Sequence, residues 1–111
     1  MESILTSIKK LLGITEEYTH FDTDLIIHIN SALGVLTQLG VGPEEGFIIT
    51  GQYEKWNEFL SDTSKLELVK TYTYLKVKQM FDPPVSSAVA ESVKRQIEEF
   101  EWRISVAASS D

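Results

Sequence analysis

Residues 23–40 read TDLIIHINSALGVLTQLG, and this segment sets how the rest of the chain can pack. Its large apolar side chains recur with the spacing of an amphipathic helix. They are Leu25, Ile26, Ile29, Leu33, Leu36 and Leu39. Asp22 or Thr23 can cap the start of this helix, and Gly40 can end it. The segment therefore predicts a long helix with one face buried in the core.

A short helix is predicted before this segment and two longer ones after it. The first covers residues 4–12 and stops at Gly13. The second runs over about 65–81. Its apolar face is centred on the stripe Leu68, Tyr72, Leu75 and Gln79 and is broadened by Leu66, Val69 and Met80. Pro83 and Pro84 end it, because proline lacks the backbone donor that a helix needs. The last helix has its stripe at Val89, Val93, Ile97, Phe100 and Ile104.

Residues 40–53 interrupt the helical pattern. They contain four of the six glycines and Pro43, yet Phe47-Ile48-Ile49-Thr50 is a strand-like run. An ordered loop or a small hairpin fits this composition, followed by about one helical turn around Trp56. The predicted fold class is all-α: a compact bundle of four main helices with one longer glycine-rich loop or hairpin insertion.

The length of 111 residues predicts one domain. We place the helical domain at residues 1–104 and a flexible C-terminal tail at 105–111, because the tail lacks large side chains to anchor it. The absence of cysteine fits a reducing cytosol. The first residues do not have the pattern of a secretory signal, and the apolar runs are too short to span a membrane. We therefore predict no membrane association.

The net charge of −7 argues against general nucleic-acid binding, which depends on cations that displace counterions from phosphates. The charge is unevenly distributed: residues 41–64 are mainly acidic, whereas 65–81 carry four lysines against Glu67. These regions are either two solvated surfaces or complementary faces that meet between neighbouring subunits.

No residue pattern predicts catalysis, a metal or a cofactor. His20 and His28 are too far apart in sequence for a paired helical zinc site. Asp22 and Asp24 are better explained as helix N-terminal carboxylates than as ligands. Adjacent acids such as Glu98-Glu99 diverge by about 100° on a helix and cannot converge on one substrate. We predict a protein that is not an enzyme.

Two segments are candidate partner interfaces. Phe47, Ile48 and Ile49 are too apolar to lie wholly in water, so they either contact a partner or fold back onto the body. Trp102 and Arg103 are residue types enriched at binding hot spots, and Trp102 should face away from the core stripe or lie over the first helix. With Val106, they begin a C-terminal end that we expect to order against a partner or a neighbouring copy.

The order of elements resembles a known family. The quoted features are Ile4-Leu5-x-x-Ile8-Lys9-Lys10-Leu11-Leu12-Gly13-Ile14, the helix from Thr23, Gln38-Leu39-Gly40-Val41-Gly42, Tyr74-Leu75-Lys76-Val77-Lys78 and Phe81-Asp82-Pro83-Pro84. Together they resemble the head-tail connector family of long-tailed bacteriophages, and the resemblance extends from Ile4 to about Ile104.

This resemblance implies an adaptor subunit of a homo-oligomeric ring, with twelve copies expected. The ring would bind the portal protein on one side and a stopper or tail-completion protein on the other, and DNA would pass through its lumen without specific binding. The implied location is the virion neck, after assembly in the host cytoplasm. The alternative is a small helical module for protein binding or regulation, which a measurement of particle size would distinguish from a ring.

Overall fold

The computed structural model describes residues 2–109 and contains five helices in that range. They are α1 (Ile4–Leu12), α2 (Asp22–Gln38), α3 (Trp56–Phe59), α4 (Leu66–Phe81) and α5 (Ser87–Ser109). The only β-type pairing among the described residues is an isolated bridge between Ser3 and Lys55. The predicted all-α class is confirmed, with α1, α2, α4 and α5 as the four main helices. The segment between α2 and α3 is a loop and not a hairpin.

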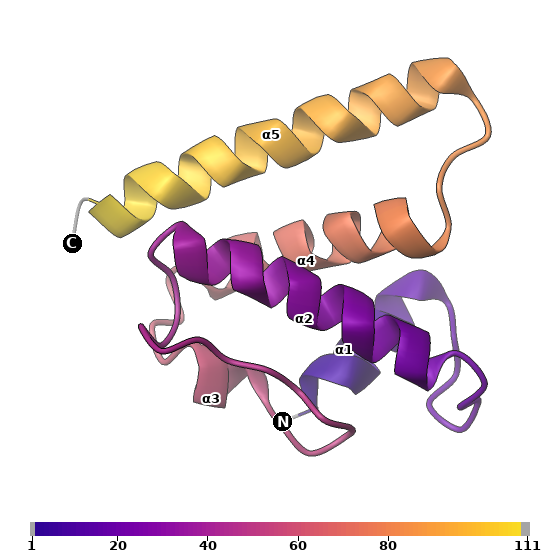
Figure 1. Cartoon of the computed structure of the whole chain (residues 1–111), viewed down its shortest axis with the longest axis horizontal. Helices are drawn as coiled ribbons and strands as arrows, with labels where there is room; N and C mark the ends of the chain where they lie inside the picture. The colour runs from indigo at the N-terminus through magenta and orange to yellow at the C-terminus, as the bar shows by residue number, and fades with distance from the viewer. Residues whose placement is uncertain (1, 110–111) are drawn as a thin grey trace.

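The helices pack around α4. Figure 1 shows α2 in front of α4, α1 beside them, and α5 along the edge of the molecule, where it packs on α4. The loop between α2 and α3 follows the edge opposite α5. Among the described helices, none combines the length and apolar character needed to cross a bilayer.

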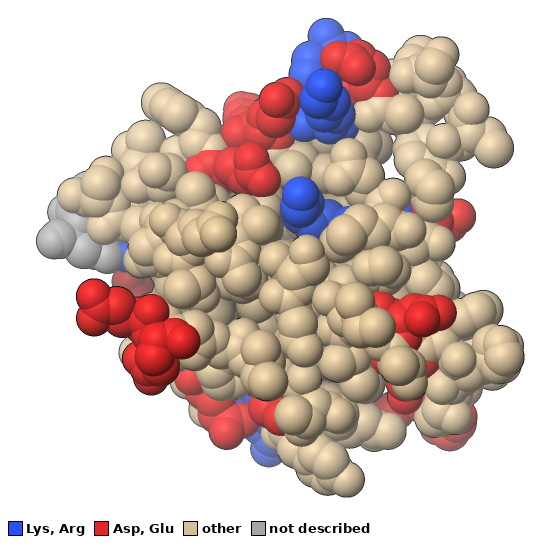
Figure 2. Space-filling view, in the orientation of Figure 1, with Lys and Arg blue, Asp and Glu red and all other residues tan. Residues whose placement is uncertain are grey.

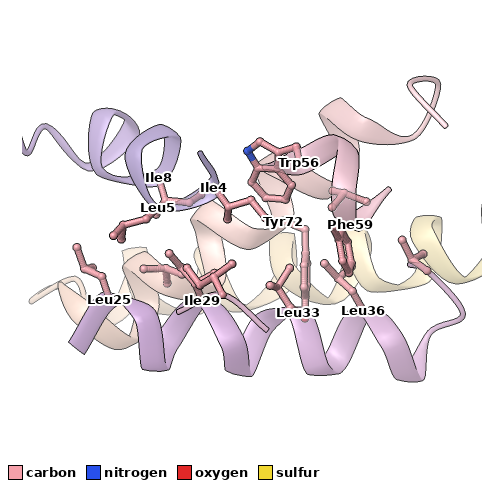
Figure 3. Close-up of a cluster of buried hydrophobic side chains, with 14 of the residues drawn as sticks. Ile4, Leu5, Ile8, Leu25, Ile29, Leu33, Leu36, Trp56, Phe59 and Tyr72 are labelled. Carbon is pink, nitrogen blue, oxygen red and sulfur yellow. The ribbon is translucent and has the colours of Figure 1, made fainter. Parts of the chain in front are cut away.

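The core lies where α1, α2 and α4 meet (Figure 3). Its α1 and α2 members are Ile4, Leu5, Ile8, Leu25, Ile29, Ala32, Leu33 and Leu36. Trp56 and Phe59 enter from α3, so this short helix closes one side of the core. Each fully buried side chain of this size contributes about 1.5–3 kcal/mol. The predicted core face of α2 is confirmed, with Ile26 and Leu39 at its half-buried margin.

The ends of α1 follow the expected chemistry. The Ser3 hydroxyl accepts a hydrogen bond from the Thr6 N–H at 3.1 Å and so caps the first turn. Gly13 ends α1 with φ 81°, a left-handed conformation that glycine adopts without strain. The predicted stop at Gly13 is confirmed.

The predicted cap of α2 is wrong. The N-cap position is Phe21, which makes no side-chain capping bond, and Asp22 is already inside the helix. The Asp22 carboxylate instead lies 2.9 Å from the ammonium group of Lys9. This cross-helix ion pair depends on tertiary packing, which local sequence signals do not report.

Two details of the predicted helix faces also need correction. Val89 begins the expected stripe of α5, yet it is 51% exposed because the first turns of α5 diverge from α4. On α4 the fully buried positions are Val69, Tyr72, Thr73 and Val77. The buried face is therefore rotated from the expected Leu68–Leu75 stripe toward Val77.

Helix α5 continues past the expected domain boundary at residue 104. Residues 105–109 are helical, and Ala108 packs against the core. A Cβ built on Gly40 would lie 3.4 Å from the Ala108 Cβ, so the last turn approaches the end of α2 closely. The flexibility of 105–111 stays a prediction, and residues 110 and 111 lie outside the described range.

Candidate interaction surfaces

The first candidate surface is the loop surface, which we define as residues 47–53. Its three predicted contact residues have different environments. Phe47 is half-buried with its ring centroid 5.5 Å from that of Phe59, and Ile49 is only 1% exposed. Ile48, between them, is 64% exposed. Phe47 and Ile49 therefore fold back onto the body, and Ile48 is the apolar side chain of the three that faces solvent.

Asn30 of α2 holds the loop surface in place. Its side-chain amide donates to the Ile49 carbonyl at 3.0 Å, and its side-chain oxygen accepts from the Ile49 N–H at 2.7 Å. One side chain thus satisfies both backbone groups of a buried residue, as a neighbouring strand would. This pairing fixes Ile49 inward, and alternation along an extended chain then turns Ile48 outward.

The end of the loop surface is held by Glu54. Its carboxylate accepts a hydrogen bond from the Thr50 hydroxyl at 2.7 Å. Burial alone would raise the pKa of Glu54, but hydrogen bonds from Thr50 and from backbone groups of the same turn outweigh it and hold the pKa below its usual value. The turn next to the exposed Tyr53 is therefore organised around a charged carboxylate.

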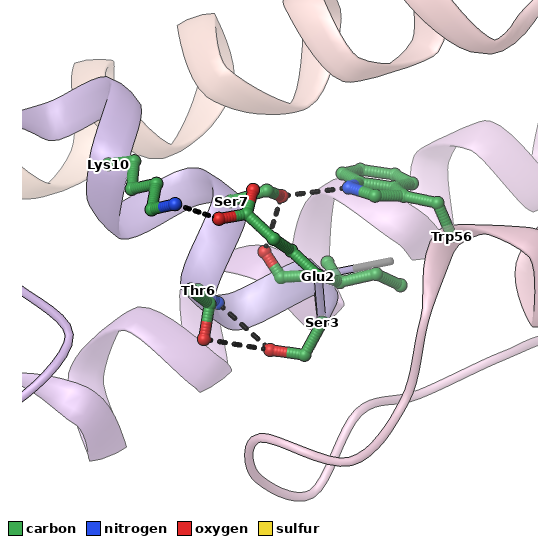
Figure 4. A network of polar contacts seen from close by, with 7 residues as sticks. Glu2, Ser3, Thr6, Ser7, Lys10 and Trp56 are labelled. Carbon is green, nitrogen blue, oxygen red and sulfur yellow. Dashed lines mark hydrogen bonds and ion pairs between the residues drawn. The ribbon is translucent and has the colours of Figure 1, made fainter.

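The segments beside the loop surface are also fixed to the body. The Trp56 indole donates to the Ser7 hydroxyl at 2.8 Å (Figure 4), and the Ile4 N–H donates to the Glu54 carbonyl at 2.9 Å. Gly42 has φ 84°, and a Cβ there would lie 2.5 Å from the Phe59 ring. Only glycine fits this position, so the loop leaves α2 along a defined path.

The second candidate surface is the α5 surface, which we define as Trp102, Arg103 and Val106. Trp102 is 67% exposed, and Val106, one turn later, is exposed as well. Ile97 and Ile104 are the fully buried positions of α5, so Trp102 points away from the body. The prediction that Trp102 faces away from the core is confirmed. The alternative, a tryptophan lying over α1, is wrong.

Arg103 and Tyr72 define the surroundings of the α5 surface. The guanidinium carbon of Arg103 lies 5.5 Å from the centre of the Phe100 ring, a cation–π contact one turn away. Beneath the helix, the buried Tyr72 hydroxyl donates to the Glu101 carboxylate at 2.8 Å. Burial and this carboxylate raise the pKa of Tyr72, so the hydroxyl keeps its proton. The bond joins α4 to α5 and fixes the rotation of α5.

The acidic and basic regions are partly neutralised within the chain. Lys65 lies 3.8 Å from Asp62, and Lys78 lies 3.6 Å from Asp82. Figure 2 shows acidic side chains in separate groups around the margin of a largely uncharged face. Some of the charge asymmetry is thus local pairing, and its role between subunits stays a prediction.

The histidines and carboxylates considered for catalysis or metal binding do not form one cluster among the described residues. His20 packs against the rings of Tyr18 and Phe21, and Asp22 pairs with Lys9. Within residues 2–109, no group of three or more metal-ligating side chains converges. Glu98 and Glu99 are exposed on α5.

Several exposed apolar residues were not predicted from the sequence. Tyr53 is 80% exposed and borders an open hollow of about 360 Å³ between the loop and α2. Ile27 and Val85 are also exposed. Ile27 could have been found, because it lies off the apolar stripe of α2. Tyr53 and Val85 stand in loops, where no periodicity indicates which side chains face water.

Comparison with known proteins gives one finding. The family model described as phage connector protein matches residues 4–111 of the chain. No curated protein and no solved structure matches the chain.

Proposed function

The chain belongs to the phage connector protein family, and we propose that it is the adaptor subunit that joins the portal of a filled head to the tail or to a stopper protein. A structural role in head–tail connection follows from the family itself. The finer proposal is that copies form a closed ring, twelve in number, at the neck of the virion.

The observation that carries the proposal is the extent of the family match. It covers residues 4–111, so it includes α1 to α5 and the loop surface rather than one local motif. A match of this length supports a connector role for the whole helical body.

The two candidate surfaces support ring formation. The loop surface and the α5 surface lie on opposite edges of the molecule (Figure 1). A subunit with different contact surfaces on its two sides associates in head-to-tail fashion, and such contacts close into a ring when the rotation between copies allows. Both surfaces are held by partly buried hydrogen bonds, so little ordering is needed when they dock.

The net charge fits a conduit for DNA. A subunit with a charge of −7 that is repeated around an axis produces a lumen that repels phosphate. We propose that DNA passes through this lumen without specific binding and that the chain has no catalytic role. Assembly takes place in the host cytoplasm.

The proposal is tested by replacing Trp102 with Ser in a complementation assay for tailed particles. Trp102 is exposed, so the variant should keep its helix content and its thermal midpoint, yet the yield of infectious particles should fall at least tenfold. Val89→Ser is the matched control, since Val89 is an exposed apolar residue of the same helix.

Two outcomes contradict this proposal. One is a normal particle yield from a cell whose only copy of the chain carries Trp102→Ser. The other is a purified chain that remains a fixed dimer at every concentration and in the presence of portal, because the binding-module alternative predicts that result.

A further inference from the structure

The further inference concerns how α5 is attached to the rest of the chain. Residues 87–92 at its start are exposed except for the half-buried Ala90, and this part of the helix lies away from α4 (Figure 1). The buried side chains of α5 are Ile97 and Ile104, which come later. Helix α5 is therefore docked on α4 mainly from Ile97 onward.

The apolar contact at the far end of α5 is small. Ile104 and Ala107 line one recess together with Val41, Leu68 and Val69. Ala107 contributes only a methyl group, so little apolar area is removed from water at that position. This end of α5 is held by one large side chain and by close approach of small ones.

A hydrogen bond between α4 and α5 has the geometry of a latch. The Tyr72 hydroxyl donates to the Glu101 carboxylate at 2.8 Å, and Glu101 lies in the docked part of α5. The Tyr72 ring is fully buried in the core that α1, α2 and α4 share (Figure 3). Because the core holds the ring, the donor keeps its position, and a hydrogen bond to a charged acceptor is stronger than one between neutral groups.

The connection between α4 and α5 is built as a hinge. It consists of residues 82–86, in which Pro83 and Pro84 have no backbone N–H to donate. Val85 is fully exposed, and residues 83–85 form no hydrogen bond with any residue from 2 to 109. Rotation within this connection can therefore move α5 without disturbing α1 to α4.

The two parts that this hinge joins can each keep their structure. The side chains labelled in Figure 3 belong to α1, α2, α3 and α4, so most of the core does not depend on α5. The start of α5 is helical although it contacts little. Its charges Glu91, Arg95 and Glu99 follow one another at the four-residue spacing that stabilises a helix by itself.

We propose that α5 is a hinged arm, which undocks from α4 as one unit about residues 82–86 while α1 to α4 stay folded, with the bond from Tyr72 to Glu101 as its latch. The α5 surface is carried on this arm, so undocking changes the direction in which Trp102 and Val106 face relative to the loop surface. The inference concerns the single chain and does not depend on the proposed ring.

Hydrogen exchange of the purified chain, followed by NMR at several low urea concentrations, tests the proposal. The amides of residues 98–106 should share one opening equilibrium with a common urea dependence, because they open together. This equilibrium should be roughly tenfold or more larger than that of the amides of residues 29–36 in α2. Equal values in the two helices, or α5 amides that open independently of one another, overturn the proposal.

Two variants separate undocking from unfolding of the whole chain. Ile8→Val removes a methyl group from the core under α1 and destabilises docked and undocked forms alike. It should therefore accelerate exchange at residues 29–36 and leave residues 98–106 unchanged. Acceleration of both sets by the same factor overturns the proposal, because α5 would then open only when the whole chain unfolds.

The latch is tested by Tyr72→Phe, which keeps the buried ring and removes the donor. The opening equilibrium of residues 98–106 should rise about threefold or more. Tyr74→Phe is the matched control, since the structure gives the Tyr74 hydroxyl no hydrogen bond within residues 2–109, and it should leave this equilibrium unchanged. Equal effects of the two variants overturn the assignment of the latch.

A disulfide provides a measurement that does not depend on the latch. A Cβ built on Gly40 lies 3.4 Å from the Ala108 Cβ, close to the separation that a disulfide requires. In the variant that carries Gly40→Cys and Ala108→Cys, the reduced and oxidised forms have the same substitutions, so strain at position 40 is present in both. Oxidation should abolish the difference in opening between residues 98–106 and 29–36, and an oxidised form that keeps it overturns the hinged arm.

Discussion

The ammonium group of Lys9 is buried, and its positive charge is compensated by one carboxylate and two backbone carbonyl oxygens. The residue is 1% exposed, and its nitrogen donates to the carbonyls of Glu16 and Tyr18 at 3.0 and 2.7 Å. With the Asp22 carboxylate at 2.9 Å, it ties the connection after α1 to the first turn of α2. One side chain thereby fixes the direction in which α2 enters the core.

Replacing Lys9 with Met should cost about 3 kcal/mol of unfolding free energy, because it leaves a largely buried carboxylate without its partner. Lys10→Met is the matched control: Lys10 is exposed and pairs with Glu2 at the surface, so this change should cost much less than Lys9→Met. Urea unfolding measures both. Equal losses would show that the ion pair of Lys9 does not support the fold.

Glu54 makes the loop surface sensitive to acid. Its pKa is held below the ordinary value of about 4.3, so its contribution to stability is present above that pH and is lost as the pH falls through the lower folded-state pKa. We expect an NMR titration to give the Glu54 carboxyl a pKa below that of an unperturbed glutamate, with the amide signals of residues 50–53 shifting together with it.

The matched variant for this titration is Glu54→Gln, which cannot titrate and should leave the amide signals of residues 50–53 constant between pH 3 and 6. A Glu54 pKa equal to or higher than that of an unperturbed glutamate would contradict these hydrogen bonds.

At this scale the sequence predicted some residues and missed others for physical reasons. The exposure of Trp102 follows from helical geometry, because a residue off the apolar stripe of α5 must face outward. The burial of Lys9 does not follow from any local pattern, because its partners come from another helix and from carbonyls of a loop. The exposure of Val89 was not predicted, because the apolar spacing of α5 extends into its first turns, where α5 lies away from α4.

The loop between α2 and α3 shows how one helix can organise an irregular element. Ile49 has its N–H and carbonyl bound by Asn30, so its side chain enters the core although no strand lies beside it. The sequence predicted an apolar, strand-like run here, and the structure uses it as a single extended segment on α2. The role of Asn30 could not be predicted, since an asparagine within a helix is usually solvated.

Asn30→Ala should release the loop surface without unfolding the bundle. We expect a loss of about 1–2 kcal/mol, because a buried N–H and a buried carbonyl lose their partners. Hydrogen exchange at the Ile49 amide should become faster, while amides in the centre of α4 keep their protection. Ser31→Ala, at the exposed position next to Asn30, is the control and should change neither quantity. An unchanged exchange rate at Ile49 in Asn30→Ala would contradict this assignment.

The helix ends divide into predictable and unpredictable ones. Gly13 and the pair Pro83-Pro84 end helices through backbone chemistry that the sequence carries directly. The end of α5 is different. Ala107 and Ala108 give no strong sequence signal for or against a helix, and they are helical where they pack against the rest of the chain. Small side chains at that position allow the close approach to Gly40.

At the scale of the whole molecule, the chain is a small helical body with its two candidate surfaces on opposite edges. The bond between Tyr72 and Glu101 fixes α5, and Asn30 fixes the loop. Its fold class and family resemblance could be predicted from helix periodicity and punctuation. The placement of the two surfaces on opposite edges could not, because it depends on how α5 returns along α4.

The central claim is that copies of this chain form a ring between the portal and the tail. A cryo-electron microscopy reconstruction of the head–tail junction, from particles assembled with this chain, tests it directly. We predict a closed ring around the DNA channel, with twelve densities that each accommodate α1 to α5. A junction that lacks this chain, or that contains it only as single or paired copies, would contradict the account.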